Sequence, residues 1–137
     1  MSMFVDLVGE SYLVVRNYIT EDRAIAEAGK FRDAYQAEGL EASADDGAYT
    51  NAVGMYQQVD GLVLLSEKVA ELSELLGASV LPTYSYGRSY FTDGSLSEHT
   101  DRASCEITCT LHLDSDEPWE LQIYNVAGEL VDISLNP

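Results

Sequence analysis

Basic residues are scarce in this chain of 137 residues, and their scarcity excludes two classes of partner. Lysine and arginine together number 7, against 24 aspartates and glutamates, so the formal net charge at pH 7 is −17. A protein that binds nucleic acid needs clustered lysine and arginine to neutralise phosphates, and a surface that binds anionic lipid needs the same charges. We therefore expect neither nucleic acid nor a membrane as a partner.

Cysteine is rare as well, and long apolar runs are missing. Cys105 and Cys109 are the two cysteines, and on one strand they would lie about 13 Å apart, too far for a disulfide. We interpret them as small buried side chains in a reducing cytoplasm. No apolar stretch approaches the length of a membrane span, and residues 1–6 lack the basic region of a signal peptide. These features predict a cytoplasmic protein.

The rest of the composition suits a folded domain. Hydrophobic residues make up 46% of the chain and charged residues 23%, a balance that allows a buried core and excludes wholesale disorder. No repeat, low-complexity tract or linker interrupts residues 1–137, so we expect a single domain of ordinary size.

The N-terminal half is expected to hold one strand and two helices. Residues 12–19 are rich in β-branched and aromatic side chains, which favour a strand. Thr20 suits the N-cap of a helix that ends near Gly39, and the polar segment Glu41–Tyr49 is expected to be a loop. A second helix, ending at Gly77, is indicated by an apolar stripe at helical spacing, formed by Leu62, Leu65, Val69, Leu72 and Leu76.

The C-terminal half shows the alternation of short antiparallel strands. We expect a turn over residues 92–95 and strands over residues 83–91, 105–113, 119–124 and 129–135. Helices followed by such strands predict an α+β protein in which the helices pack on one face of a sheet. Short strands joined by turns also suit a jelly roll or a related double sheet.

His99-Thr100-Asp101 is the sharpest chemical feature of the sequence. On an extended segment, residues two apart point to the same side, so the His99 imidazole and the Asp101 carboxylate can meet one metal ion. A neutral nitrogen and an anionic oxygen suit a divalent first-row metal such as Fe(II). The same three residues also suit a solvated turn without a ligand, and the pattern alone does not decide between the two interpretations.

Arg88 stands among tyrosines on the expected strand before this motif. The face that alternate residues share carries three phenols as well as Arg88, those of Tyr84, Tyr86 and Tyr90. A guanidinium suits a ligand carboxylate, and a tyrosine hydroxyl can add a hydrogen bond to it. An equally good interpretation is that Arg88 forms an ion pair near the sheet edge with an acidic neighbour, namely Asp93, Glu98 or Asp101.

A longer block surrounds these residues. It comprises Leu81-Pro82-Thr83-Tyr84-Ser85-Tyr86-Gly87-Arg88-Ser89-Tyr90, Gly94, Leu96, His99-Thr100-Asp101-Arg102, Cys105-Glu106-Ile107 and Thr110-Leu111. The block resembles the Fe(II)/2-oxoglutarate-dependent oxygenases of the prolyl 4-hydroxylase-like kind found in phages and marine bacteria. The leucine-striped helix and the strand and helix before it fit the N-terminal layout of that family, so the resemblance covers most of the chain.

The resemblance implies a partial double-stranded β-helix that holds Fe(II) by a His-x-Asp…His triad. His99 and Asp101 match the first two ligands, and Arg88 with Tyr84 or Tyr90 would line the 2-oxoglutarate pocket. Such enzymes couple decarboxylation of 2-oxoglutarate to oxidation of a substrate. The implied function is hydroxylation of a C–H bond in a peptide or small molecule, in the cytoplasm of a bacterium or a phage-infected host cell.

The sequence departs from the family at its end. After Asn136-Pro137 the family continues with the distal histidine and a basic residue that holds the far carboxylate of 2-oxoglutarate. Here no arginine or lysine follows Arg102, and His112 comes too early to match the distal ligand. On the polar face of its expected strand, His112 is either a substitute ligand or a histidine bonded to a neighbour or to water.

Three explanations of the missing end stay open. The chain is a fragment of a longer oxygenase, or a second polypeptide completes the sheet at an open edge, or a decayed oxygenase fold now serves a structural role. The last gives the rival function, a non-catalytic assembly or binding protein such as a virion component. An incomplete barrel with an exposed edge also favours self-association or a partner chain.

Overall fold

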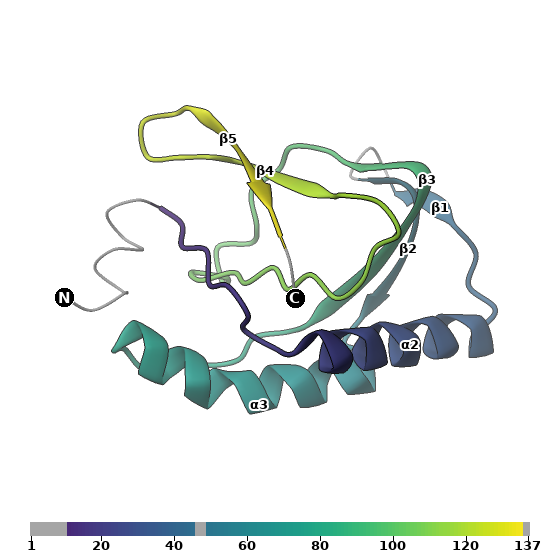
Figure 1. The fold of residues 1–137 in the computed structure, drawn as a ribbon, viewed down its shortest axis with the longest axis horizontal. Helices are drawn as coiled ribbons and strands as arrows, with labels where there is room; N and C mark the ends of the chain where they lie inside the picture. Colours follow the sequence, from purple (N-terminus) through teal and green to yellow (C-terminus); the bar gives the residue numbers. More distant parts are fainter. Residues whose placement is uncertain (1–10, 46–48, 136–137) are drawn as a thin grey trace. The chain divides into compact units, whose positions relative to one another are not determined.

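The computed structural model describes residues 11–45 and 49–135, which contain two helices and five strands (Figure 1). All strand pairs are antiparallel: β1, β2 and β3 form one sheet in that order, and β4 and β5 form a second. This arrangement confirms the predicted α+β class. In chain order the elements are α2 (Glu21–Ala37), β1 (Ser43–Asp45), β2 (Tyr49–Tyr56), α3 (Val59–Leu76), β3 (Tyr86–Leu96), β4 (Glu120–Tyr124) and β5 (Leu130–Ser134).

The described residues form two compact units that interleave along the chain. Unit 1 takes the described parts of Met1–Ala28, Glu67–Leu81 and Thr110–Pro137, and unit 2 takes those of Gly29–Ser66 and Pro82–Cys109. Both helices cross a boundary, because α2 and α3 each contribute residues to both units. Each unit is therefore assembled from segments that lie far apart in the sequence.

The two helices match the predicted ones closely, and their ends show why. The backbone N–H of Arg23 donates to the Thr20 hydroxyl at 3.2 Å, which makes Thr20 the N-cap of α2. Gly39 and Gly77 follow the two helices with φ angles of 67° and 66°, in the left-handed region that favours glycine. At the start of α3, the Gln58 side chain accepts the backbone N–H of the third helical residue at 3.1 Å.

The core of unit 2 lies between α2 and the middle strand, β2. Val53 and Met55 of β2 are 3% and 7% exposed and form a buried cluster with Tyr35 of α2. Phe31, one helical turn earlier, packs against this cluster. Gly87 of β3 leaves room for the Phe31 ring, since a Cβ at this position would overlap the ring. Because Gly87 has no side chain, α2 can lie close to β3 at this position.

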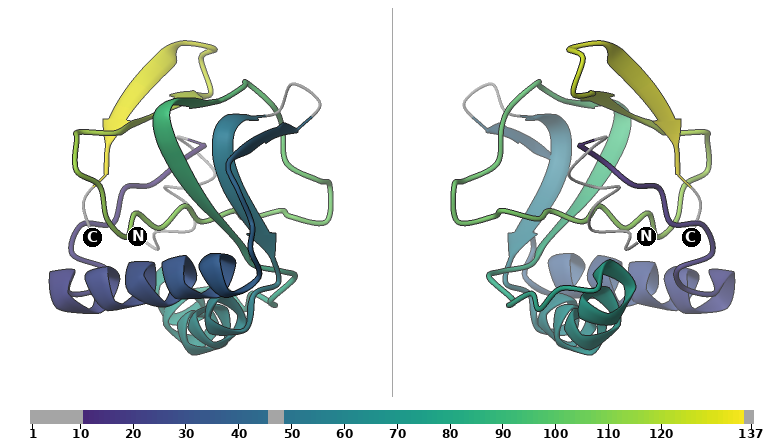
Figure 2. Two further views of the ribbon diagram at one scale, coloured as in Figure 1. Left: turned by 90° about the vertical axis from the view of Figure 1, so that its right-hand side faces the viewer. Right: turned by 90° about the vertical axis from the view of Figure 1, so that its left-hand side faces the viewer.

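The strands β2 and β3 lie side by side (Figure 2), with one interruption. The register shifts between Thr50 and Ala52, so that residues 91–94 of β3 bulge opposite Asn51. The side-chain amide of Asn51 donates to the Thr92 carbonyl oxygen at 2.6 Å and holds the bulge. The turn that the sequence predicts here is thus a bulge inside a longer strand.

The hairpin of β4 and β5 belongs to unit 1 and matches the strands predicted over residues 119–124 and 129–135. Its turn is closed by Asn125, whose backbone N–H donates to the Glu129 carbonyl oxygen at 3.0 Å. The Asn125 side-chain oxygen accepts the N–H of Glu129 at 2.9 Å. Gly128 has a φ of 79°, which the turn requires and most other residues resist.

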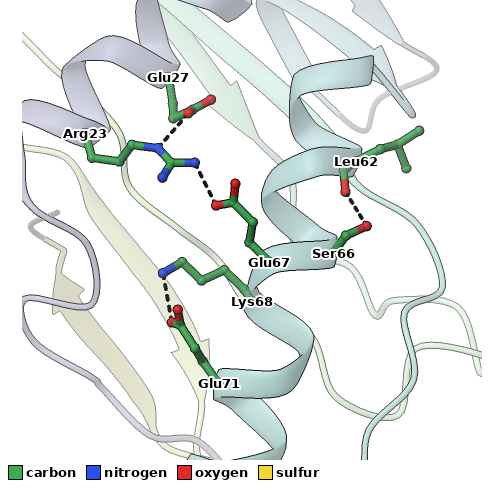
Figure 3. A network of polar contacts seen from close by, with 7 residues as sticks. All are labelled: Arg23, Glu27, Leu62, Ser66, Glu67, Lys68 and Glu71. Atoms are coloured by element: carbon green, nitrogen blue, oxygen red, sulfur yellow. Dashed lines mark hydrogen bonds and ion pairs between the residues drawn. The ribbon is translucent and has the colours of Figure 1, made fainter.

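In unit 1 the guanidinium of Arg23 joins the two helices (Figure 3). Its Nε donates to Glu27 Oε1 at 2.7 Å within α2, and a terminal nitrogen donates to Glu67 Oε2 of α3 at 2.8 Å. The side chain of Glu27 is 5% exposed and that of Glu67 is 45% exposed. The hydrogen bond with Glu27, and then that with Glu67, raises the pKa of Arg23. The link between the helices therefore combines a buried carboxylate with an exposed one.

Two of the strands predicted from the sequence are wrong. Residues 12–19 and 105–113 are irregular and take no part in either sheet of the described chain. In the first segment Asn17 has a φ of 54°, which breaks the extended run. At the start of the second, the N–H of Cys105 donates to the Arg102 carbonyl oxygen at 2.8 Å and turns the chain. Strand propensity without a pairing partner does not produce a strand.

The two cysteines, the helices and the predicted loop over Glu41–Tyr49 can also be compared with the expectations from the sequence. Cys105 and Cys109 are free, but they are half-buried and exposed, so the prediction that both are buried is wrong. Across the described ranges, no helix has the length and apolar character needed to cross a bilayer. The loop predicted over Glu41–Tyr49 contains β1, and residues 46–48 of that loop lie outside the described part, as do residues 1–10 and 136–137.

Candidate functional site

His99 and Asp101 lie in unit 2, in the irregular segment that follows β3. Their side chains converge, with His99 Nε2 and Asp101 Oδ1 3.5 Å apart, and both side chains are exposed. The structure thus brings together the two side chains that the sequence predicts as metal ligands. Their role as ligands stays a prediction.

The backbone of Ser97 fixes the orientation of the His99 ring. Ring Nδ1 lies 2.8 Å from the Ser97 carbonyl oxygen. Because a carbonyl oxygen only accepts, Nδ1 carries the hydrogen, and in the neutral ring Nε2 then directs a lone pair toward the Asp101 carboxylate. Two acceptors in this arrangement repel each other unless a cation, either a second proton or a metal ion, lies between them. Histidines that bind metals commonly have such a bond at the other nitrogen.

The His99–Asp101 pair fits part of a metal centre. Metal–ligand bonds of about 2.1 Å would place two neighbouring donors roughly 3.0–3.4 Å apart, close to the 3.5 Å that separates Nε2 from Oδ1. Among the described residues, no three or more His, Cys, Asp or Glu side chains form a group that could hold a metal ion. The pair therefore supplies two donors, and no third His, Cys, Asp or Glu side chain of the described residues joins them.

His112, the candidate substitute ligand, has a local partner. Its Nε2 lies 3.2 Å from the Ser115 hydroxyl oxygen. Because residues 105–113 do not form a strand, the face that was expected to direct His112 toward the site does not exist. The structure supports the second interpretation of this residue, a histidine bonded to a neighbour.

Arg88 of β3 lies among aromatic rings. Its guanidinium carbon is 4.5 Å from the ring centroid of Tyr49, 4.8 Å from that of Tyr86 and 5.9 Å from that of Tyr90. One terminal nitrogen donates to the Tyr90 hydroxyl at 3.2 Å. Gly54 pairs with Arg88 across the sheet and leaves space for this cluster, because a Cβ there would overlap the Tyr86 hydroxyl. We call Arg88 with these three tyrosines the Arg88 cage.

The Arg88 guanidinium has no acidic partner among the described residues. This observation excludes the ion pair that was the alternative interpretation. Burial disfavours its charge, but hydrogen bonds with Tyr90 and Tyr86 outweigh that effect and raise its pKa. Its Nε is buried and has no hydrogen-bond acceptor in the described part of the chain. A buried charged N–H of this kind can donate a hydrogen bond to an oxygen of an anionic ligand.

Tyr84 lies apart from the Arg88 cage. Its ring centroid is 5.4 Å from that of Tyr56 and 5.4 Å from the guanidinium carbon of Arg102. The neighbouring Cys105 thiol contributes most to raising the pKa of the Tyr84 hydroxyl, and the charge of Asp101 acts in the same direction. Of the two tyrosines predicted to accompany Arg88, only Tyr90 does so, whereas Tyr84 lies beside Tyr56 and Arg102.

Three contributors to the site were not predicted. Tyr49 begins β2, a strand that the sequence does not predict, and its ring is the one nearest to the Arg88 guanidinium carbon. Ser97 acts through its backbone carbonyl, for which no side-chain signal exists. Arg102 follows Asp101 directly in the quoted block, and this position could have drawn attention to it.

Comparison with known proteins does not assign the chain to a family. No protein-family model, curated protein or solved structure matches the chain. The assignment of a function therefore depends on the residues of this chain and on the contacts described above.

Proposed function

We propose that this chain carries the metal-binding and co-substrate-binding groups of an Fe(II)/2-oxoglutarate-dependent oxygenase, which hydroxylates a C–H bond of a peptide or small molecule. The supporting observation is the His99–Asp101 pair, in which Nε2 and Oδ1 face each other at 3.5 Å while the Ser97 carbonyl oxygen occupies the other ring nitrogen. The resemblance of residues 81–111 to that family suggests which metal and which co-substrate. In this proposal the two sheets belong to a partial double-stranded β-helix.

His99 and Asp101 would hold the iron, and the metal would relieve the repulsion between their facing lone pairs. Ser97 keeps the imidazole in the tautomer that leaves Nε2 available. Iron, when bound, supplies the redox chemistry that oxidises the substrate. Because the described residues offer two donors, we expect weak and exchangeable metal binding by this chain alone.

The Arg88 cage would bind a carboxylate of 2-oxoglutarate. The buried Nε–H lacks an acceptor, and the Tyr90 hydroxyl already contacts the guanidinium. Three surrounding rings exclude water from one side of the cation, which strengthens its attraction for an anion. In a chain with more than three acidic residues for each basic one, an arginine without an acidic partner is a strong candidate for ligand binding.

Manganese(II), which suits the same donors as iron and resists oxidation, provides the test of the metal site. We expect the full chain to reduce the electron paramagnetic resonance signal of free Mn(II), and His99→Ala and Asp101→Asn to lose this effect. His112→Ala is the matched control and should bind as the parent does. Loss of binding in His112→Ala but not in His99→Ala would refute the assignment. Circular dichroism checks that each variant is folded.

A second titration tests the co-substrate site. Adding 2-oxoglutarate should tighten Mn(II) binding by the parent chain, because its carboxylates would contact both the metal and Arg88. Arg88→Met should remove this effect, while Arg32→Met, an exposed arginine of α2, should retain it. Equal behaviour of the two variants would contradict the proposed role of the Arg88 cage.

The absence of a third donor among the described residues favours a second candidate, a non-catalytic assembly or binding protein on the same scaffold. In the described sheet β3 pairs with β2 only and forms an edge, which suits a strand from a second copy or a partner chain. Failure of the parent chain to bind Mn(II), together with a stable oligomer in light scattering, would favour this candidate over the oxygenase.

A further inference from the structure

A hollow in unit 2 lies between the end of α2 and the turn that leads from β2 into α3. Its volume is about 420 Å³, within the range of pockets for small ligands. Glu38 and Leu40 line it from the end of α2, and Tyr56, Gln57 and Val59 line it from the turn. Neither the His99–Asp101 pair nor Arg88 lines this space. We call it the Glu38 hollow.

The charge of the hollow comes from a carboxylate in an unfavourable position. Glu38 directly follows the last residue of α2, where the helix dipole disfavours a negative charge, and the last turn of α2 contains no basic residue. Its carboxylate forms neither an ion pair nor a hydrogen bond with any residue of the described ranges. An unpaired anion kept against the dipole is available to a cation from outside the chain.

Three apolar side chains stand among the polar ones that line the hollow, and all three are exposed. Leu40, Tyr56 and Val59 are 39%, 53% and 66% exposed. Aliphatic side chains beside a carboxylate suit the methylene groups of a ligand that ends in an ammonium group. A tyrosine ring adds a face to which a cation is attracted.

The wall at the turn is held in a defined conformation. Gln57 has a φ of 55°, in the left-handed region that residues with a Cβ seldom adopt, and its N–H donates to the Ser85 carbonyl oxygen at 2.9 Å. The Gln58 side chain is fixed by bonds to Gly61 N and to the Asp60 carboxylate, at 3.1 Å and 2.9 Å. A preformed wall reduces the entropy that a ligand loses on binding.

Two tyrosine rings connect the hollow with the proposed metal site. Tyr56, which lines the hollow, lies 5.4 Å from Tyr84 between ring centroids. The Tyr84 ring in turn lies 5.4 Å from the guanidinium carbon of Arg102, which directly follows Asp101 in the chain. All of these residues belong to unit 2, so this connection does not depend on how the units are arranged.

We infer that the Glu38 hollow binds a primary ammonium group on an aliphatic chain, such as the side chain of a lysine. The ammonium would pair with Glu38, and its methylene groups would lie along Leu40, Val59 and the Tyr56 ring. The net charge of −17 would attract such a cation to the protein. Binding of this ligand does not depend on the proposed function; in the proposed oxygenase the same ligand would be the substrate, and only that role rests on the proposed function.

The test uses the full chain without metal, with Nα-acetyl-lysine N-methylamide as the probe. Nuclear magnetic resonance should show shifts of the Gln57 and Gln58 amide signals as the probe is added. Glu38→Gln should weaken binding about tenfold, as the loss of one charge-assisted hydrogen bond implies. Glu74→Gln, which removes an exposed carboxylate outside the hollow, is the matched control and should leave the affinity unchanged.

Two further probes decide the chemistry of the ligand. The norleucine analogue, which keeps the aliphatic chain without the ammonium, should produce no shifts, and binding as tight as that of the lysine probe would overturn the inference. Equal weakening by Glu38→Gln and Glu74→Gln would also overturn it. Butylamine distinguishes the source, since weaker binding than the lysine probe indicates a peptide and equal binding indicates a small amine. Because no metal is present, failure here leaves the Mn(II) test of the proposed function unaffected.

Discussion

Replacing Arg23 by methionine is expected to destabilise unit 1 by more than the loss of a surface ion pair would. The contact with Glu67, whose side chain is 45% exposed, is screened by solvent and contributes little. The contact with Glu27 contributes more, because that carboxylate is 5% exposed and its hydrogen bond to a charged group is shielded from water. Arg23 is itself 39% exposed, so solvent screening reduces both contributions. We therefore expect a loss of stability that is larger than that of a fully exposed ion pair.

Urea unfolding measured by tryptophan fluorescence suits this prediction, because the chain has a single tryptophan, Trp119, and it belongs to unit 1. Because the midpoint falls in proportion to the loss of stability, the midpoint of Arg23→Met should lie clearly below that of the parent chain. Glu71→Gln is the control, since it breaks only the partly exposed contact with Lys68 and should cost less than about 0.5 kcal/mol. Equal midpoints for Arg23→Met and Glu71→Gln would refute the reasoning from the buried carboxylate.

Three further predictions concern single sites. Thr20→Ala should lower the stability by about 0.5–2 kcal/mol through loss of the N-cap of α2, and thermal unfolding should show Thr20→Asn close to the parent. Gly87→Ala should cost about 1–3 kcal/mol because a Cβ would overlap the Phe31 ring, whereas Gly29→Ala, with open space and a helical backbone, should stabilise. Although Cys109 is exposed as a residue, its thiol is partly desolvated by its surroundings, which raises its pKa, so its alkylation in the folded chain should rise at a higher pH than in urea.

Each of these three has an outcome that would contradict it. An unchanged stability of Thr20→Ala would show that another group caps α2. Gly87→Ala and Gly29→Ala with the same unfolding midpoint would show that the Phe31 ring can move at no cost. For Cys109, measured in a variant whose other cysteine is serine, identical pH profiles in the folded and unfolded chain would remove burial as the cause. The neutral thiol favours the folded state below the unfolded pKa, and this contribution is lost as the pH rises above it.

The sequence predicts both helices well because their signals are local. Thr20 caps the start of α2, and a glycine ends each of α2 and α3, so these signals act within a few residues. The apolar stripe of α3 can likewise be recognised without knowledge of the rest of the fold. The hairpin of β4 and β5 is predicted for the same reason, since its turn lies between two short alternating segments.

The strands that depend on distant partners were predicted poorly. Residues 12–19 and 105–113 have the composition of strands but find no partner in the described sheets. Conversely, β2 carries Asn51 and Gly54, which resemble turn residues, although one supports the bulge and the other makes space beside the Arg88 cage. Pairing across a long sequence separation decides such cases, and a single sequence does not show it.

In the candidate site, too, contacts between residues close in sequence can be predicted, whereas contacts that depend on strand pairing cannot. The approach of His99 to Asp101 follows from their spacing of two residues, which is local information. The choice of Tyr90 rather than Tyr84 beside Arg88, and the arrival of Tyr49, depend on where β3 begins and on its register with β2. The unpartnered carboxylate of Glu38 has no sequence signal beyond its place at the end of a helix.

The interleaving of the two units sets an order in which the protein can form during synthesis. All segments of unit 2 have been made once residue 109 has been translated, whereas unit 1 still needs the hairpin of β4 and β5. At about 5–20 residues per second, the nascent chain spends a few seconds in this half-finished state. During that interval the unit 1 parts of α2 and α3 already have each other, joined by Arg23, but the hairpin of their unit has not yet been translated.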